Sequence, residues 1–92
     1  MIVSFDHKGL ERFFRTGSHA DVQPKHAKRL RLQLGRLDAA SKAADMNLPG
    51  WRFHPLKGPL AGHYAVWVDQ NWRLTFTLEG GYAMSVNYLD YH

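Results

Sequence analysis

Residues 72–78 read Trp72-Arg73-Leu74-Thr75-Phe76-Thr77-Leu78, and apolar and polar side chains alternate along them without a break. Successive side chains of a β-strand point to opposite faces of the sheet. The alternation therefore predicts a strand with one face for the core and a second face free for polar groups. The apolar face is Trp72, Leu74, Phe76 and Leu78, and the opposite face is Arg73, Thr75 and Thr77.

Three further strand patterns flank this one. On its C-terminal side, Glu79-Gly80-Gly81 reads as a turn into a strand over residues 82–88, where Tyr82, Met84, Val86 and Tyr88 alternate with smaller residues. On its N-terminal side, Asp69-Gln70-Asn71 connects it to a strand over 63–68, and a loop over 57–62 leads back to a strand over 51–56. Pro55 lacks an amide hydrogen and predicts an edge position or a bulge. Short turns favour an antiparallel meander.

The N-terminal half of the chain contains one strand pattern and two helical ones. Residues 1–5 predict a strand, and Asp6 is expected to cap a helix that Gly17 ends. After a connector over residues 18–23, Pro24 begins a second helix that is expected to run to about Met46. This order predicts a single α+β domain over residues 1–92, with the N-terminal strand and two helices packed on one face of a curved, mainly antiparallel sheet.

The longer helix has two contrasting faces. Apolar residues at helical spacing predict a buried stripe, and Gly35 predicts close packing against a bulky neighbour. The opposite surface is basic, which is typical of a solvated face; docking of ribosomal RNA or of an acidic protein is the alternative. The stripe is Ala27, Leu30, Leu34, Leu37, Ala40 and Ala44, and the basic residues are Lys25, Lys28, Arg29, Arg31, Arg36 and Lys42.

Composition narrows the class of protein. Twelve Lys and Arg against eight Asp and Glu give a formal net charge of +4, which favours an anionic partner such as nucleic acid but also simply keeps a small protein soluble. The absence of cysteine excludes disulfides and thiolate chemistry. No apolar run is long enough to cross a bilayer and no signal-peptide pattern is present, so a cytoplasmic location is expected.

Four charged or titratable side chains between residues 51 and 92 can form a metal-free acid/base site for an anionic substrate. The imidazoles of His54 and His92 exchange protons near neutral pH, as general acid/base catalysis requires. Arg73 can hold a phosphate through paired hydrogen bonds, and Lys57 can offer an ammonium group to it. Taken singly, each of these is also a common surface residue.

Asp90 and Tyr91 complete the candidate set. Asp90 can orient an imidazole or cap a turn, and Tyr91 can bind a base or phosphate or pack into the core. Trp67 is interpreted as a core or sheet-surface residue. Other chemistries fit poorly, because the sequence has no Gly-rich phosphate loop, no helical zinc-binding histidine pair and no nucleophile elbow. The remaining histidines, His7, His19, His26 and His63, are interpreted as mostly surface residues.

Four motifs together resemble one family. "SFDHKGLERFF" (residues 4–14), "WRFHPLKG" (51–58), "NWRLTF" (71–76) and "NYLDYH" (87–92) resemble the HigB toxins of host-inhibition toxin–antitoxin systems, within the RelE/ParE superfamily. The resemblance covers nearly the whole chain. It implies the microbial RNase (RelE-like) fold and an endonuclease that cleaves mRNA on translating ribosomes.

The resemblance also implies a site and partners. The family's functional positions fall on His54, Lys57, Arg73, Asp90, Tyr91 and His92, and the implied reaction is attack of an RNA 2′-hydroxyl on the adjacent phosphate, with no metal and no cofactor. Which histidine acts as base is left open. The implied partners are the ribosome with its mRNA and a HigA-type helix-turn-helix antitoxin, through which operator DNA is contacted only indirectly. The alternatives are a ParE-like inhibitor of DNA gyrase and an RNA-binding module without turnover.

Overall fold

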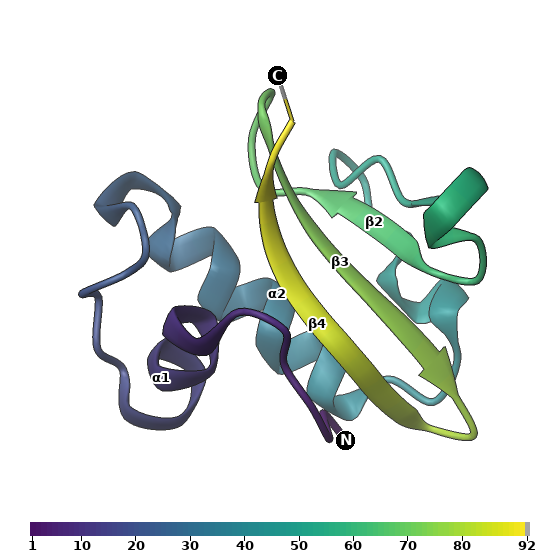
Figure 1. Cartoon of the computed structure of the whole chain (residues 1–92), viewed down its shortest axis with the longest axis horizontal. Helices are drawn as coiled ribbons and strands as arrows, with labels where there is room; N and C mark the ends of the chain where they lie inside the picture. Colours follow the sequence, from purple (N-terminus) through teal and green to yellow (C-terminus); the bar gives the residue numbers. More distant parts are fainter. Residues whose placement is uncertain (92) are drawn as a thin grey trace.

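The structure, a computed structural model, describes residues 1–91, and these form two α-helices beside one four-stranded antiparallel sheet (Figure 1). None of the helices in this part of the chain is long and apolar enough to cross a membrane. The helices are α1 (Lys8–Thr16) and α2 (Ala27–Ala39), the strands are β1 (His54–Pro55), β2 (Tyr64–Trp67), β3 (Trp72–Glu79) and β4 (Tyr82–Asp90), and the short 3-10 turns are η1 (Pro24–His26), η2 (Ala43–Met46) and η3 (Gly58–Leu60).

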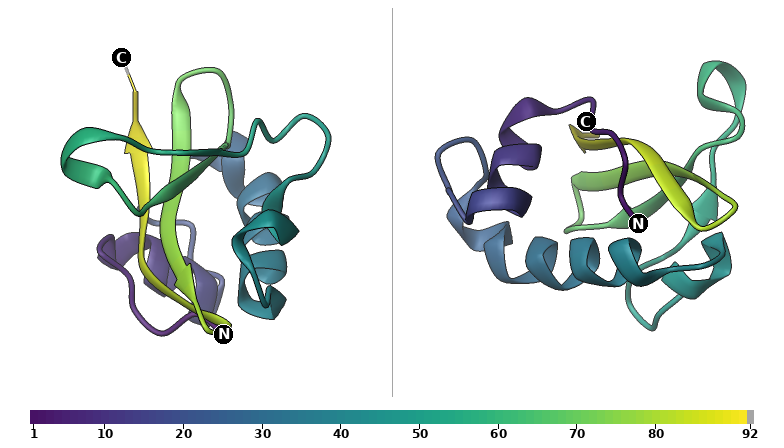
Figure 2. Two further views of the ribbon diagram at one scale, coloured as in Figure 1. Left: turned by 90° about the vertical axis from the view of Figure 1, so that its right-hand side faces the viewer. Right: turned by 90° about the horizontal axis from the view of Figure 1, so that it is seen from below.

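The sheet has one covered face and one open face. α2 crosses one face, α1 lies beside α2 near the N-terminal segment, and η3 projects on the side away from α2 (Figure 2). The predicted α+β architecture is confirmed. Apolar side chains between α2 and the sheet form the core, because their burial removes apolar surface from water. The fully buried ones include Leu30, Leu34, Leu37, Val66, Leu74, Phe76 and Val86.

β3 has the alternation that its sequence predicts. Leu74 and Phe76 are completely buried, and Trp72 packs against the same core. Thr75 points to the other face and is also buried, because it lies in the middle of the sheet between β2 and β4. Arg73, nearer the end of the strand on that same face, stays partly exposed.

β4 contains a bulge that interrupts the predicted alternation. The register between β3 and β4 shifts by one residue, and Ser85 at the shift has a left-handed backbone with φ of 54°. Beyond the bulge, Val86 and Tyr88 face the core as predicted. The expectation that Tyr82 and Met84 share this face is wrong: they are 54% and 46% exposed, because the extra residue reverses the alternation.

The bulge also explains why residues 1–5 do not form the predicted strand. They run parallel to β4 but make only two isolated bridges, Ile2 with Ala83 and Phe5 with Val86. Between the bridges, the amide of Ser85 donates to the side-chain oxygen of Ser4 at 2.9 Å rather than to a backbone carbonyl. A continuous ladder is therefore broken at the bulge.

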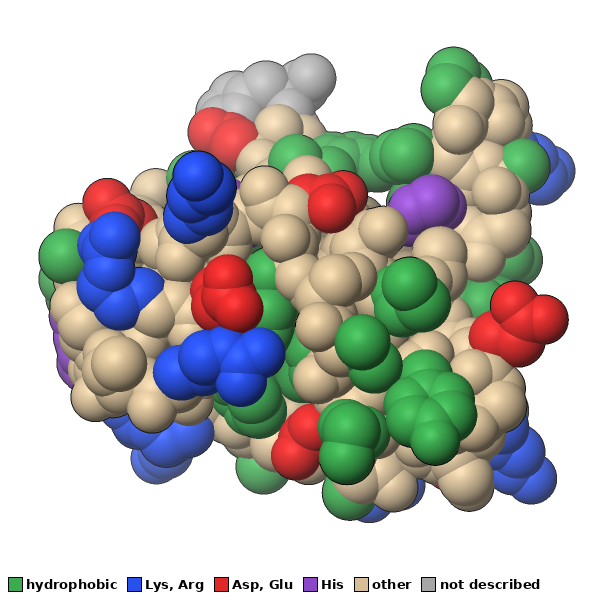
Figure 3. All heavy atoms as spheres, turned by 60° about the horizontal axis from the view of Figure 1, so that its bottom comes forward, with side chains coloured by type: hydrophobic (Ala, Val, Ile, Leu, Met, Phe, Trp, Pro, Cys, Tyr) green, Lys and Arg blue, Asp and Glu red, His purple; other side chains and the backbone are tan. Residues whose placement is uncertain are grey.

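Exposed apolar side chains gather where the N-terminal segment and the start of β4 lie side by side. Figure 3 shows this apolar surface, and the large exposed residues of the two segments are Met1, Val3, Tyr82 and Met84.

The first helix begins one residue later than predicted. His7, not Asp6, is its N-cap, and the imidazole Nδ1 accepts a hydrogen bond from the Leu10 amide at 3.0 Å. Helix N-caps are usually Asp, Asn, Ser or Thr, and histidine is not among them, so the sequence pattern predicted the neighbouring Asp6 as the cap. Gly17 ends the helix with φ of 79°, as predicted.

The second helix is shorter than predicted. Residues 24–26 form a 3-10 turn, α2 ends at Ala39, and residues 43–46 form a second 3-10 turn. The helix stops because the Asp45 carboxylate accepts hydrogen bonds from the amides of Ser41 and Lys42, which offers the backbone an alternative to a further helical turn.

Two expectations for the helix faces are wrong. A Cβ on Gly35 would meet nothing within 4 Å, so this glycine is not a close-packing position. Ala44 is exposed, because the chain has already left α2. The glycine in close contact is Gly9 in α1, where a Cβ would collide with the side chain of Asp21.

The predicted strand over residues 51–56 is reduced to β1. Arg52 has φ of 51°, which breaks the extended backbone after Trp51. β1 pairs only with β2, so the edge position predicted from Pro55 is confirmed.

Candidate active site

Strand register places two of the predicted site residues, together with an aromatic side chain, on the open face of the sheet. Arg73 lies opposite Trp67 of β2 and Leu89 of β4. His54 lies opposite Ala65, which shares the face of Trp67 two residues away. Leu74, the neighbour of Arg73, points to α2 instead. His54, Trp67 and Arg73 therefore project from the same side of the sheet, away from α2.

An aromatic ring brings two guanidinium groups together on this face. The Arg73 guanidinium carbon lies 4.2 Å from the centre of the Trp67 ring, and that of Arg52 lies 4.5 Å from it. Arg73 also lies 5.4 Å from the ring centre of Tyr91. Cations bind to aromatic faces through the negative charge of the π system, so the half-buried indole holds both arginines in place.

The turn between β2 and β3 fixes the direction of Arg73. Its Nη1 donates to the carbonyl oxygens of Asp69, Gln70 and Trp72 at 2.9, 3.0 and 3.2 Å. Burial lowers the pKa of Arg73, Tyr91 and Asp69 oppose this, and the neighbouring charge of Arg52 lowers it further. Two like charges held close together gain most from an anion bound between them, so the pair favours a phosphate group.

His54 has one ring nitrogen available for proton transfer. Its Nδ1 lies 2.7 Å from the carbonyl oxygen of Arg52. A carbonyl only accepts, so Nδ1 carries the hydrogen and a neutral imidazole has its lone pair on Nε2. Lys57, three residues after His54, is exposed and is the N-cap residue of η3, the turn that projects on the side of the sheet away from α2.

The C-terminal candidates divide between the two faces. Tyr91 joins Arg73 on the open face, and its amide donates to the carbonyl oxygen of Asn71 at 2.6 Å. Asp90 lies opposite Trp72, so strand alternation directs it to the other face, where its charge helps to raise the pKa of Tyr88. His92 lies outside the described residues.

Sequence reasoning missed Arg52 and gave Trp67 too small a role. Arg52 stands two residues before His54, but its left-handed backbone is not visible in the sequence, so nothing indicated that it would lie over Trp67. The only indication of Arg52 in the sequence is in the motif "WRFHPLKG". There the arginine stands two residues before the histidine, which is the spacing of side chains on one face of a strand.

A buried hydrogen-bonded chain supports the turn that holds Arg73. The prediction that His26 is a surface residue is wrong: it is 2% exposed. Its Nδ1 lies 2.5 Å from the Tyr88 hydroxyl, and its Nε2 lies 2.5 Å from Asp69 Oδ2. Asp69 Oδ1 accepts from the amides of Asn71 and Trp72 at 2.8 and 2.9 Å.

The titration of Asp69 and Tyr88 reflects these contacts. Burial raises the pKa of Asp69, but hydrogen bonds from His26, Asn71 and Trp72 outweigh it and lower the pKa to about 2. Burial raises the pKa of Tyr88, which stays a neutral donor. Tyr88 therefore donates to His26 and His26 donates to ionised Asp69, so each polar group in this chain has a partner.

Residues 1–91 contain no cluster of three or more His, Asp or Glu side chains placed to hold a metal ion. The Nδ1 of His63, just before β2, is buried without a hydrogen-bond partner among the described residues.

Comparison with known proteins gives consistent results along the whole chain. Residues 3–92 match the model of the HigB-like toxin family, described as the RelE-like toxin of the type II toxin–antitoxin system HigB. The chain is 38% identical over 92 residues to Endoribonuclease HigB of Proteus vulgaris, with 100% of both chains covered. It is 34% identical to Toxin HigB-1 of Vibrio cholerae serotype O1, with 100% of this chain and 98% of that protein covered.

Solved structures show the same fold. The toxin–antitoxin complex YoeB–YefM of Staphylococcus aureus contains a chain that matches with a TM-score of 0.66 at 20% identity, covering 100% of this chain and 95% of that one. A YafQ variant from E. coli matches with a TM-score of 0.56 at 15% identity, covering 98% and 91%. The predicted RelE-like fold is thereby confirmed.

Proposed function

Because the chain belongs to the HigB-like family of RelE-like toxins of type II toxin–antitoxin systems, we propose that it is an endoribonuclease that cleaves mRNA on translating ribosomes. The relative from Proteus vulgaris carries the name endoribonuclease. The proposed partners are a HigA-type helix-turn-helix antitoxin, the ribosome and its mRNA, with operator DNA contacted only through the antitoxin. A toxin–antitoxin complex among the structures of the same fold supports an antitoxin partner.

One observation carries the proposal: Arg73, Arg52, Trp67, Tyr91 and His54 share the open face of the sheet. His54 and Arg73 are two strands and two residues apart, roughly 12 Å between Cα atoms. The proposed position of the phosphate is between them, beside the Trp67 ring that both Arg73 and Arg52 contact. The face is not covered by a helix of residues 1–91, so an extended RNA strand can lie across it (Figure 2).

The proposed reaction needs only proton transfer and charge stabilisation. A base removes the proton of the 2′-hydroxyl, whose oxygen attacks the adjacent phosphorus while the bond to the 5′-oxygen of the next nucleotide breaks. An acid gives a proton to that leaving oxygen. The products are a 2′,3′-cyclic phosphate and a 5′-hydroxyl end. Nε2 of His54 is suited to the first transfer because Nδ1 is occupied by the Arg52 carbonyl.

The charged residues stabilise the pentacoordinate phosphorus. Arg73 and Arg52 hold its equatorial oxygens, and Lys57 adds an ammonium group from the segment before η3. Tyr91, beside Arg73, positions the phosphate or a neighbouring base. His92 is the proposed second proton carrier, with Asp90 as a residue that positions it.

A toeprint or primer-extension assay on a defined mRNA tests this function. Wild type and the His54→Ala, Arg52→Ala and His92→Ala variants are added to a purified translation system with and without ribosomes. Cleavage within ribosome-bound codons by wild type, and strongly reduced cleavage by the variants, is expected. Arg12→Ala, an exposed arginine on α1, is the matched control. Intact mRNA with folded protein that is toxic in cells would instead indicate a protein target such as DNA gyrase.

A further inference from the structure

One buried histidine is connected by hydrogen bonds to the turn between β2 and β3. His26 is the last residue of η1, the turn before α2, and lies against the covered face of the sheet. Its Nε2 lies 2.5 Å from Asp69 Oδ2, and Asp69 Oδ1 accepts hydrogen bonds from the amides of Asn71 and Trp72. A single carboxylate therefore ties the backbone of the turn to His26.

The same turn sets the direction of Arg73 on the open face. Its Nη1 donates to the backbone carbonyl oxygens of Asp69, Gln70 and Trp72. Backbone carbonyls are placed only as accurately as the turn that carries them. A shift of the turn would therefore move the guanidinium group away from the position in which it meets a phosphate.

The surroundings of His26 do not require a polar side chain for stability. His26 is 2% exposed, and its ring centre lies 5.6 Å from the ring centre of Trp72 and 5.8 Å from that of Tyr88. Burial of an imidazole costs free energy unless both nitrogens form hydrogen bonds. An apolar side chain of similar volume would fill this space without that cost. The hydrogen bond from His26 to Asp69 therefore does more than fill the core.

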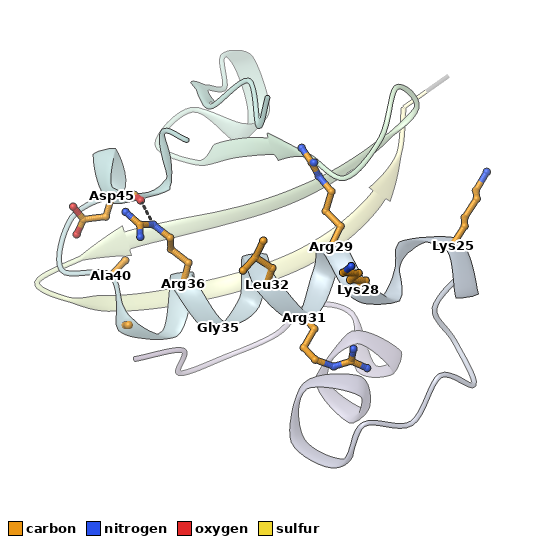
Figure 4. Close-up of a pocket in the computed structure, with 10 residues that line it drawn as sticks. Lys25, Lys28, Arg29, Arg31, Leu32, Gly35, Arg36, Ala40 and Asp45 are labelled. Carbon is orange, nitrogen blue, oxygen red and sulfur yellow. Dashed lines mark hydrogen bonds between the residues drawn. The ribbon is translucent and has the colours of Figure 1, made fainter. Parts of the chain in front are cut away.

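Lys25 also lies near Asp69, but its contact is too weak to hold the turn. Its Nζ lies 4.0 Å from Asp69 Oδ2, and 70% of its side chain is exposed. Figure 4 shows Lys25 extending outward from the turn before α2. An ion pair that water screens in this way contributes little free energy and does not fix a direction. The position of the carboxylate therefore depends on His26.

We propose that His26 is a positioning residue for the cleavage reaction, and that it acts on Arg73 through Asp69 and the β2–β3 turn. The inference rests on the proposed function, because it takes Arg73 as a group that stabilises the charge on the phosphate. A misplacement of about 1 Å in such a group can lower the rate by about 100-fold. Nε2 is the nitrogen that matters, since it faces Asp69 while Nδ1 faces the Tyr88 hydroxyl.

Two amide substitutions separate the roles of the two nitrogens. In His26→Gln, the side-chain amide reaches the place of Nε2 and can donate to Asp69. In His26→Asn, the shorter amide reaches only the place of Nδ1 and faces Tyr88. Each variant keeps a polar group in the core and loses one of two buried hydrogen bonds, so we expect similar losses of stability, which thermal denaturation measures. The pair is therefore matched in everything except the contact with Asp69.

Cleavage by the two variants is compared in the primer-extension assay with ribosomes. At saturating protein, the single-turnover rate is expected to fall by about 30-fold in His26→Asn and by less than about threefold in His26→Gln. The protein concentration for half-maximal cleavage should change little in either variant, because Arg52 and Lys57 still bind the phosphate in the proposed site. Equal rates of the two variants would overturn the proposal.

A double-mutant cycle tests whether His26 acts through Arg73. When it is added to Arg73→Ala, His26→Asn should lower the rate by less than about threefold, because the side chain that it positions is already absent. A residue that merely stabilised the fold would lower the rate by the same factor in both backgrounds. The full loss of about 30-fold in the Arg73→Ala background would contradict a positioning role.

The orientation of Arg73 can also be measured without catalysis. Nitrogen-15 NMR follows its guanidinium resonances, which are assigned by their absence in Arg73→Ala. Hydrogen bonds to the turn slow the exchange of the Nη hydrogens with water, so we expect exchange about tenfold faster in His26→Asn than in wild type and His26→Gln. Equal exchange in the three proteins would rule the inference out. If wild-type protein does not cleave mRNA, the proposed function fails, and the exchange rates still decide whether His26 positions Arg73.

Discussion

The two faces of the sheet are built from different kinds of contact. The face under α2 is apolar and completely buried at Leu74 and Val66, so its energy comes from the removal of apolar surface from water. The open face holds Arg73 through backbone carbonyls and the Trp67 ring. Adjacent residues of β3 thus serve opposite purposes: one position stabilises the fold and the next carries charge. Stability and chemistry should therefore be separable by mutation along a single strand.

The largest effect is expected from Arg73→Ala. In the proposed reaction, the charge that develops on the phosphate would lose its main donor on the open face. We expect cleavage of ribosome-bound mRNA to fall by about 1,000-fold, which corresponds to about 4 kcal/mol of transition-state stabilisation. The melting temperature should fall less than in a truncation of the core, since the variant loses hydrogen bonds to the turn and the contact with Trp67 but leaves no buried cavity. Cleavage rates from primer extension, beside thermal denaturation, measure both quantities, and a folded variant with wild-type rates would remove Arg73 from the site.

Leu74→Ala is the matched test of the covered face. This side chain is completely buried, and its loss leaves a cavity between the sheet and α2. We expect the free energy of unfolding to fall by about 3 kcal/mol in urea titrations. Leu32→Ala is the control, since this leucine is 63% exposed and should cost less than about 0.5 kcal/mol. If Leu74→Ala, at conditions where it is folded, reduced cleavage as strongly as Arg73→Ala, the two faces would not be separable.

The covered face was the easier one to predict from the sequence. β3 and the buried stripe of α2 follow from local periodicity, which repeats every two residues in a strand and every 3.6 in a helix. The open face depends on contacts between distant residues. The turn that holds Arg73 is supported from the covered side by His26, whose partners are 43 and 62 positions away, and no local pattern indicates them. Arg52 reaches Trp67 only because its backbone turns to a positive φ.

The sequence motifs therefore supplied a list of candidate residues, but not their arrangement in space. His54 and Arg73 share a face because of the register of three strands, which depends on the lengths of the intervening turns. The bulge at Ser85 has no glycine or proline to indicate it, so the faces of Tyr82 and Met84 were predicted wrongly.

Asp69→Asn tests the connection between the two faces. The pKa of Asp69 is lowered in the folded protein from 3.8 to about 2, so its ionised form stabilises the fold above about pH 4 and this contribution disappears as the pH falls toward 2. Because a third of the side chain is exposed and water screens the charge, we expect a loss of about 1 kcal/mol at pH 7. The difference from wild type should shrink between pH 4 and pH 2 in urea titrations.

The control for this prediction is Asp6→Asn. This variant removes an exposed carboxylate that does not cap α1 and is distant in sequence from the β2–β3 turn that contains Asp69. Its free energy of unfolding should match that of wild type within about 0.3 kcal/mol. A constant difference between Asp69→Asn and wild type from pH 7 to pH 2 would show that the carboxylate does not stabilise the turn through its charge.

The smallest effect on stability is expected at Ser85, in the bulge where the alternation of β4 side chains between the two faces of the sheet is reversed. Ser85 has φ of 54°, a conformation that strains a side chain but not glycine. Ser85→Gly keeps the amide that donates to Ser4, so we expect a gain of about 0.5 kcal/mol in the free energy of unfolding. Asn87→Gly, two residues further along β4, should instead lose about 1 kcal/mol, since Asn87 has no such strain to relieve and its Oδ1 accepts a hydrogen bond from the Tyr88 amide at 2.9 Å. If both variants lost stability equally, the backbone at Ser85 would be ordinary strand, and the exposure of Tyr82 and Met84 would need another cause.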